Sequence, residues 1–250
     1  MKAITRHIPN TITSLNLFSG CLAITFAFRG FLDIAVYCIF AAAVFDFFDG
    51  FAARLLKAYS PMGLQLDSLA DMVSFGVAPA VLLHVVLYNN IGASMDKLPL
   101  LAVSVIPFVL AVFSGLRLAK FNIDTRQSES FIGMPTPACT LLVASTVLAS
   151  LHNECVARIL ANDWLIIIGS IVLSLLLVSE IPMFSLKFKK QSSRSAFFKK
   201  YAIQVVFLVI CVLSPIFFGV FFIAAMILLY IALSLVLWLV KPKSTETANK

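Results

Sequence analysis

Four aspartates stand close together in an otherwise apolar chain, in the stretch DFFDGFAARLLKAYSPMGLQLDSLAD from residue 46 to 71. Asp46 and Asp49 are three residues apart and Asp67 and Asp71 are four apart, so each pair shares one face of an α-helix. Ionised carboxylates beside a bilayer core are costly unless cations offset them. Oxygen ligands without His or Cys suit Mg²⁺, Mn²⁺ or Ca²⁺ rather than zinc. The aspartates therefore predict a metal site, and two divalent ions would balance their charge.

The residues around the aspartates favour a phosphate ligand. Gly50, Ala52, Ala53 and Gly63 are small enough for a ligand to approach the backbone closely, and Arg54 adds a positive charge. Paired divalent ions can polarise both the attacking and the leaving oxygen in phosphoryl chemistry. A carboxylate that is not fully used as a ligand could then serve as a general base.

Helix capping and cation transport are alternative roles for the aspartates. Capping suits Asp67 alone, because Asp46 and Asp49 lie near a helix C-terminus, where the helix dipole disfavours anions. A cation pathway through a secondary transporter would place acids near the bilayer midplane in several spans. The acidic residues of the remaining spans lie near predicted span ends: Asp33, Asp163 and Glu180. A catalytic metal site is therefore the favoured interpretation.

The composition indicates which elements position these residues. Of 250 residues 61% are hydrophobic and 12% charged, which is typical of integral membrane proteins. Apolar stretches of about 20 residues, the length that crosses a bilayer, predict an all-α polytopic bundle of about eight transmembrane helices. The expected spans are roughly 12–28, 34–53, 69–89, 98–118, 136–152, 164–184, 201–215 and 216–240. We expect one domain over residues 1–240 and a short polar tail over 241–250.

The distribution of basic residues predicts the orientation. Cytoplasmic loops are enriched in Lys and Arg. With an even number of spans the termini share one side, which carries all 19 Lys and Arg except Arg29, Lys97 and Arg158. The termini and the active site, at the cytoplasmic ends of helices two and three, are thus expected on the inner face of the cell (inner) membrane. The basic run 187–200 is interpreted as a loop against anionic lipid, and no nucleic-acid partner is expected.

The aspartate stretch resembles the signature of the CDP-alcohol phosphatidyltransferase family, D-x2-D-G-x2-A-R-x8-G-x3-D-x3-D. The matching residues are Asp46, Asp49, Gly50, Ala53, Arg54, Gly63, Asp67 and Asp71. The resemblance implies transfer of a phosphatidyl group from a CDP-linked lipid to an alcohol, with release of CMP. It also implies that the aspartates bind two divalent ions, Mg²⁺ or Mn²⁺, and that Asp71 is the base. The resemblance places the nucleotide and phosphate pocket at Gly50, Ala53, Arg54 and Gly63.

Three further stretches are similar to the phosphatidylserine synthase branch of this family: IPNTITSLNLFSG (8–20), SFGVAPA (74–80) and GLRLAKFNIDTRQSESFIGMPTPA (115–138). The similarity implies CDP-diacylglycerol as donor, L-serine as acceptor, contact with membrane lipids and a homodimer. By resemblance Thr13 and Asn16 reach the CDP group, although hydrogen bonding between helices explains them equally well. Glycerol 3-phosphate or an inositol phosphate is the alternative acceptor.

Candidate acceptor-binding residues follow the fourth expected span. Arg117, Asn122 and Arg126 are polar residues at its cytoplasmic end. The planar guanidinium of Arg is suited to a carboxylate, so Arg117 or Arg126 could hold the serine carboxylate or a lipid phosphate. The alternative is that these residues only anchor the helix at the cytoplasmic surface.

Overall fold

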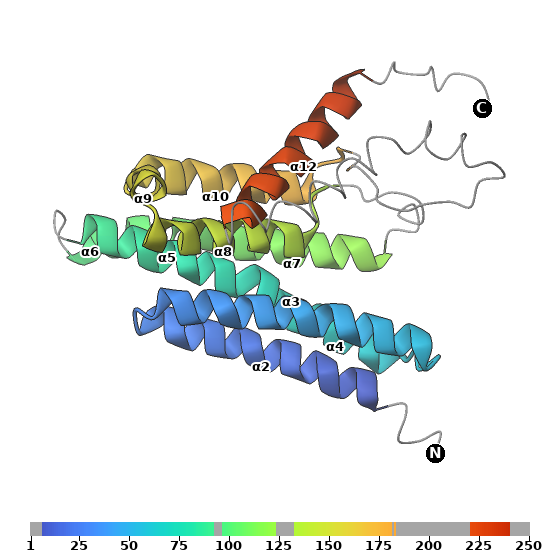
Figure 1. The fold of residues 1–250 in the computed structure, drawn as a ribbon. Helices are drawn as coiled ribbons and strands as arrows, with labels where there is room; N and C mark the ends of the chain where they lie inside the picture. Colours follow the sequence, from blue (N-terminus) through green and yellow to red (C-terminus); the bar gives the residue numbers. More distant parts are fainter. Residues whose placement is uncertain (1–6, 93–96, 124–132, 182, 184–220, 241–250) are drawn as a thin grey trace.

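A computed structural model describes residues 7–92, 97–123, 133–181, 183 and 221–240. Within these residues the only regular elements are helices, which confirms the all-α prediction (Figure 1). The elements are α2 (Ile8–Phe28), α3 (Leu32–Leu55), α4 (Pro61–Asp71), η1 (Met72–Val77), α5 (Ala78–Ile91), α6 (Lys97–Ser104), η2 (Ile106–Phe108), α7 (Val109–Ile123), α8 (Thr136–His152), α9 (Glu154–Leu160), α10 (Asp163–Val178) and α12 (Phe221–Val240). Of these, η1 is a π-helix and η2 a 3₁₀-helix.

Several of these helices are long and apolar enough to cross a membrane. The described residues hold four of them, or five if the pair α9 and α10, bent by 77°, forms one span. The four are Ile8–Phe28, Leu32–Leu55, Pro61–Ile91 and Pro99–Ile123. Helix α8 and residues 222–236 of α12 are shorter apolar helices. A membrane protein is therefore supported, whereas the total of eight spans stays a prediction. The expected span 201–215 and the tail 241–250 lie outside the described residues.

The helix that carries Asp67 and Asp71 begins earlier than the apolar pattern predicted. We expected it to start near residue 69, but α4 begins at Pro61. Ser60 caps it, because its Oγ accepts a hydrogen bond of 3.0 Å from the backbone N–H of Gly63, and proline fits the first helical position. Asp67 and Asp71 therefore lie inside a helix, and neither is needed as its N-cap.

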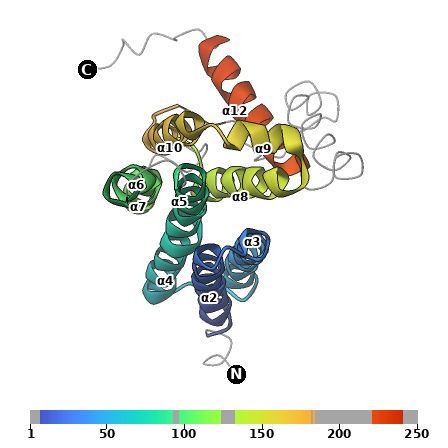
Figure 2. The same ribbon diagram turned by 90° about the vertical axis from the view of Figure 1, so that its left-hand side faces the viewer.

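Small residues allow α2 and α3 to pack closely. Ala23 and Ala27 of α2 and Ala35 and Ala42 of α3 are buried, and small side chains let helix backbones approach one another in membrane proteins. Helix α5 lies near the centre of the bundle, with α8 on one side and α7 on the other (Figure 2). Every residue from 74 to 83 except Val77 is buried. The direction of this central helix is thus set by contacts on all sides.

Four helix ends meet at the same end of the bundle. The N-terminal ends of α2 and α4 lie there with the C-terminal ends of α3 and α7, on the right in Figure 1. Since α3 and α4 run in opposite directions around a short turn, Asp46 and Asp49 come to face Asp67.

Candidate active site

Three of the four aspartates form one cluster. Carboxylate oxygens of Asp46, Asp49 and Asp67 lie within 4.8 Å of one another. Asp49 is buried, and the other two are half-buried. Two of these carboxylates come from adjacent turns of α3 and the third comes from α4, so the cluster depends on how closely these helices pack.

The fourth aspartate is held by the first helix. Asp71 lies one turn after Asp67 on α4, and its Oδ1 accepts a hydrogen bond of 3.3 Å from Nδ2 of Asn16. Its electrostatic neighbours are Asp46 and Asp67. Asn16 is fully buried, with 0% of its surface exposed. The structure thus places this predicted nucleotide contact directly on Asp71.

The cluster fits a divalent cation. Oδ2 of Asp49 and Oδ1 of Asn16 are both buried and make no hydrogen bond. A buried oxygen without a partner is unfavourable, and a cation beside Asp46, Asp49 and Asp67 would satisfy the Asp49 oxygen. Because all the ligands are oxygens, they suit Mg²⁺ or Mn²⁺.

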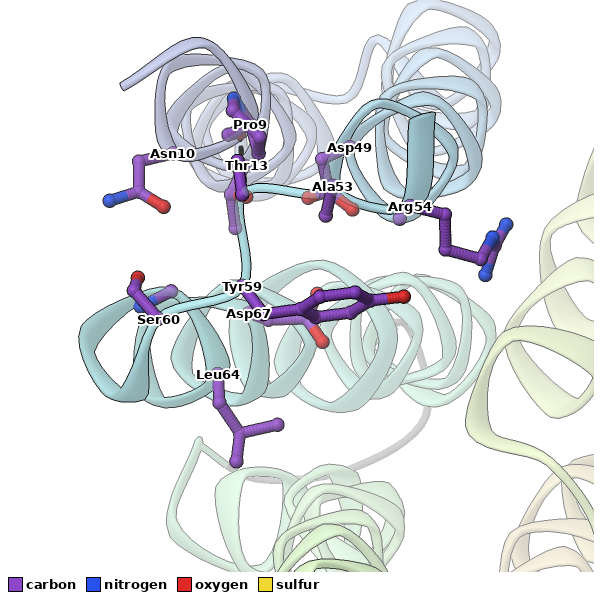
Figure 3. A pocket seen from close by; sticks show the side chains of 13 residues that line it. Pro9, Asn10, Thr13, Asp49, Ala53, Arg54, Tyr59, Ser60, Leu64 and Asp67 are labelled. Carbon is purple, nitrogen blue, oxygen red and sulfur yellow. Dashed lines mark hydrogen bonds between the residues drawn. The ribbon is translucent and has the colours of Figure 1, made fainter. Parts of the chain in front are cut away.

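A cavity of about 170 Å³ opens beside the cluster (Figure 3). Its walls come from the start of α2, the end of α3, the turn after it and the start of α4. The lining includes Asp49, Asp67 and every residue predicted for the nucleotide pocket except Asn16, namely Thr13, Gly50, Ala53, Arg54 and Gly63. The remaining lining residues were not predicted: Pro9, Asn10, Ala58, Tyr59, Ser60 and Leu64. The Ser60–Pro61 turn signal and the polar start of span one were the available clues to them.

Gly63 stands where α2 and α4 approach each other closely. A Cβ atom at this position would lie 3.0 Å from Oδ1 of Asn10 and 3.0 Å from Oγ of Ser60. Gly50 is different, because a Cβ there would meet nothing closer than Nη1 of Arg54 at 3.8 Å. Gly63 therefore lets α2 and α4 meet at the cavity wall, and Gly50 leaves room beside the guanidinium of Arg54.

A second cavity, of about 210 Å³, lies on the other side of α4. Asp67 and Asp71 line it together with Ser68, Arg117, Asn122 and Thr136. Arg117 is only 4% exposed, and Nδ2 of Asn122 donates a hydrogen bond of 2.8 Å to Oγ of Ser68. Two of the three predicted acceptor residues therefore stand beside Asp71. The third, Arg126, lies outside the described residues, and Ser68 and Thr136 were not anticipated.

The two cavities share Asp67. A ligand in the first would reach the carboxylates from the side of α2 and α3, and a ligand in the second would reach them from α7. Lys120, close to Arg117, instead pairs with Glu180 at 3.5 Å. The arrangement suits a reaction between two ligands that meet at Asp67, with Asp71 on the side of the second cavity.

Known proteins resemble this chain over much of its length. The family model described as CDP-alcohol phosphatidyltransferase matches residues 6–176. A CDP-diacylglycerol–serine O-phosphatidyltransferase of Bacillus subtilis is 37% identical over 178 residues, which are 70% of this chain and 88% of that protein. The enzyme of the same name from Helicobacter pylori is 37% identical over 142 residues, 56% of each chain. An archaetidylserine synthase of Methanothermobacter thermautotrophicus is 33% identical over 158 residues, 61% of this chain and 64% of that protein.

Proposed function

Since the chain belongs to the CDP-alcohol phosphatidyltransferase family of enzymes, we propose that it transfers the phosphatidyl group of CDP-diacylglycerol to the hydroxyl of L-serine. The products are phosphatidylserine and CMP. The observation that carries this proposal is the pair of cavities that share Asp67, the second of which is also lined by Asp71. The first cavity is lined by Arg54, which can bind a phosphate of the donor, and by the carboxylates of Asp49 and Asp67. The second is lined by the buried Arg117, which can bind the carboxylate of an amino acid.

In the proposed reaction Asp71 accepts the proton of the serine hydroxyl. The serine oxygen forms a bond to the phosphorus that carries the diacylglycerol, and the bond from this phosphorus to the CMP oxygen breaks. CMP leaves with that electron pair. Two Mg²⁺ or Mn²⁺ ions, held by Asp46, Asp49, Asp67 and Asp71, would stabilise the negative charge on the phosphate oxygens.

The remaining site residues bind and orient the substrates. Thr13, Gly50, Ala53 and Gly63 shape the nucleotide cavity, and the guanidinium of Arg54 stands at its wall to bind phosphate. The lipid tails reach the site sideways from the bilayer.

The acceptor side uses a separate set of residues. Arg117 binds the serine carboxylate through two parallel N–H bonds, a geometry that Lys cannot provide. Asn122 and Arg126 complete the acceptor side. Serine enters through the second cavity, so it reaches Asp71 without crossing the nucleotide cavity.

The proposal includes the topology predicted from the sequence. The active site and both termini face the cytoplasm, in a bundle of about eight spans in the cell (inner) membrane. The protein acts as a homodimer among membrane lipids. The basic residues gathered on the side of the aspartates support this orientation.

The test is release of CMP by the detergent-purified protein, given CDP-diacylglycerol and Mn²⁺ or Mg²⁺. L-serine, glycerol 3-phosphate and inositol phosphate are compared as acceptors. We expect CMP release that depends on serine and on the metal. If only another acceptor works, the serine assignment is wrong; if none does, cation-coupled uptake into proteoliposomes tests the transporter alternative.

The role of Asp71 has a matched control. Asp71→Asn removes the base but keeps the side-chain volume, so we expect turnover to fall by at least about 100-fold. Asp33→Asn makes the same change in the first turn of α3, at the opposite end of the helix from the cluster, and should keep wild-type turnover. Both variants should elute as the wild type does in size-exclusion chromatography. Wild-type turnover in folded Asp71→Asn would refute the assignment of the base.

A further inference from the structure

A π-helix interrupts the long third helix directly after Asp71. It runs from Met72 to Val77, and the N–H of Ala78 donates to the carbonyl of Val73, five residues earlier. A π turn holds one residue more than the α-helical pattern allows, and such turns are frequent at functional sites. The α-helix resumes with α5 at Ala78.

Pro79 explains why the helix widens here. Proline has no N–H, and in a regular α-helix its ring would clash with the carbonyl four residues earlier, which is that of Phe75. This carbonyl accepts instead from another helix: the hydroxyl of Thr140 on α8 lies 2.7 Å from it. The same hydroxyl is 3.0 Å from the carbonyl of Thr136 within α8. Thr140 and Phe75 are both buried, so water cannot replace this hydrogen bond to the Phe75 carbonyl.

Helix α2 holds the π turn from the opposite side. The hydroxyl of Ser74 donates a hydrogen bond of 3.0 Å to the carbonyl of Asn16, the residue whose side chain contacts Asp71. One turn later, a Cβ at Gly20 would lie 2.9 Å from Cα of Ser74, so only glycine permits this approach. The π turn is therefore fixed between α2 and α8.

This turn decides which way the carboxylates of α4 point. One additional residue rotates the preceding helix by about 100° relative to the following one, because an α-helix has 3.6 residues per turn. The orientation of α5 is set by its burial on all sides. The face of α4 that carries Asp67 and Asp71 is consequently determined by the π turn and by what stabilises it.

We propose that Pro79 and Thr140 are positioning residues for the aspartate site. Pro79 opens the π turn, and the Thr140 hydroxyl holds it open by binding the Phe75 carbonyl. Together they direct Asp67 and Asp71 toward Asp46 and Asp49 of α3. Neither residue lines either cavity, so both act through the backbone. The kinetic part of this inference rests on the proposed transferase activity.

The first test removes one hydroxyl at a time. Thr140→Val deletes the bond to Phe75 with little change in shape, and Thr140→Ser keeps the hydroxyl. The control is Thr146→Val on the same helix, whose hydroxyl binds the Leu142 carbonyl at 2.7 Å within α8. For Thr140→Val we expect kcat to fall by at least about tenfold, since small misplacements of reacting groups are costly. The KM for CDP-diacylglycerol should change little, and Thr140→Ser should restore kcat.

A second variant tests the turn while leaving the Thr140 hydroxyl in place. Pro79→Ala restores an N–H that can bind the Phe75 carbonyl, so the helix can return to the α pattern and rotate α4. Because proline disfavours a helix interior, this variant is expected to be as stable as the wild type or more so. Its kcat should nevertheless fall.

Two readouts do not depend on turnover. Hydrogen exchange of the amides of residues 72–80 should be faster in Thr140→Val and slower in Pro79→Ala than in wild type. The rise in thermal stability on adding Mn²⁺ should be smaller in both variants, because the carboxylates no longer converge.

The outcomes separate this inference from the proposed function. If the wild type releases no CMP, the proposed function fails, and hydrogen exchange and Mn²⁺ stabilisation still test the turn. If the wild type is active and folded Thr140→Val or Pro79→Ala keeps the kcat of Thr146→Val, the positioning role is overturned. If Thr140→Val does not fold, the kcat of Pro79→Ala alone tests the positioning role.

Discussion

The side-chain amide of Asn16 on α2 donates a hydrogen bond of 3.3 Å to Oδ1 of Asp71 on α4. A carboxylate can only accept, so the contact requires Nδ2 of Asn16 to face Asp71 and directs the amide oxygen elsewhere. That oxygen is buried and has no hydrogen-bond partner. The same residue accepts from Ser74 through its backbone carbonyl. Asn16 thus connects the proposed base to the π turn.

This contact predicts the effect of Asn16→Asp. The substitution keeps the shape but places a second carboxylate against Asp71, where a donor is needed, and buries a like charge. We expect kcat to fall by about 100-fold, with a smaller effect on the KM for CDP-diacylglycerol. Steady-state CMP release measures both quantities.

The matched control is Asn90→Asp. Nδ2 of Asn90 donates a hydrogen bond of 2.8 Å to the carbonyl of Leu160, far from the aspartates. This variant should keep the wild-type kcat. Equal rates in the two variants would show that Asn16 has no special connection with the reaction.

Gly63→Ala should weaken donor binding. The added methyl group would lie 3.0 Å from both Asn10 and Ser60, so the wall of the nucleotide cavity must shift. We expect a higher KM for CDP-diacylglycerol and an unchanged KM for serine, measured by CMP release at varied concentrations of each substrate. Gly169→Ala is the control, because a Cβ there meets nothing within 4 Å. It should gain up to about 1 kcal/mol of stability from better helix propensity and keep its kinetics.

Removal of the metal should stop the reaction and lower stability. Without a cation, Asp46, Asp49 and Asp67 repel one another at short range. EDTA is expected to abolish CMP release, and Mn²⁺ or Mg²⁺ to restore it. Mn²⁺ at about 100 times its Kd should stabilise the fold by about 2.7 kcal/mol, seen as a higher midpoint of thermal unfolding. Asp67→Asn should reduce this rise in the unfolding midpoint, and Asp33→Asn should not. An equal rise in both variants would show that the ion binds away from Asp67.

Arg117→Lys tests recognition of the acceptor. Lysine keeps the charge but cannot form two parallel bonds to a carboxylate. We expect the KM for L-serine to rise by about tenfold or more, which corresponds to the loss of a hydrogen bond to a charged group. The preference for serine over ethanolamine, which lacks the carboxylate, should shrink by a similar factor. A change confined to the KM for CDP-diacylglycerol would instead assign Arg117 to the lipid phosphate.

Much of the site could be predicted from the sequence because its aspartates lie close together along the chain. The spacing of Asp46 and Asp49, and of Asp67 and Asp71, places each pair on one helical face whatever the rest of the chain does. Apolar length identified helices close to their observed bounds, for example 136–152 for Thr136–His152. The predicted start of α4 was wrong because Ser60 and Pro61 favour a turn, although the same two residues also begin a helix.

Residue types and helical periodicity act over a few residues, so the carboxylate chemistry and the helices that carry it can be predicted from the chain alone. Which groups meet across helices depends on the packing of the whole bundle. Asn16 and Asp71 are 55 residues apart, and Thr140 and Phe75 are 65 apart. The widened turn before Pro79 also needed the fold, since a proline in a helix can kink it, end it or widen it. Here the packing of α2 and α8 selects the π turn, and this packing is a property of the whole bundle.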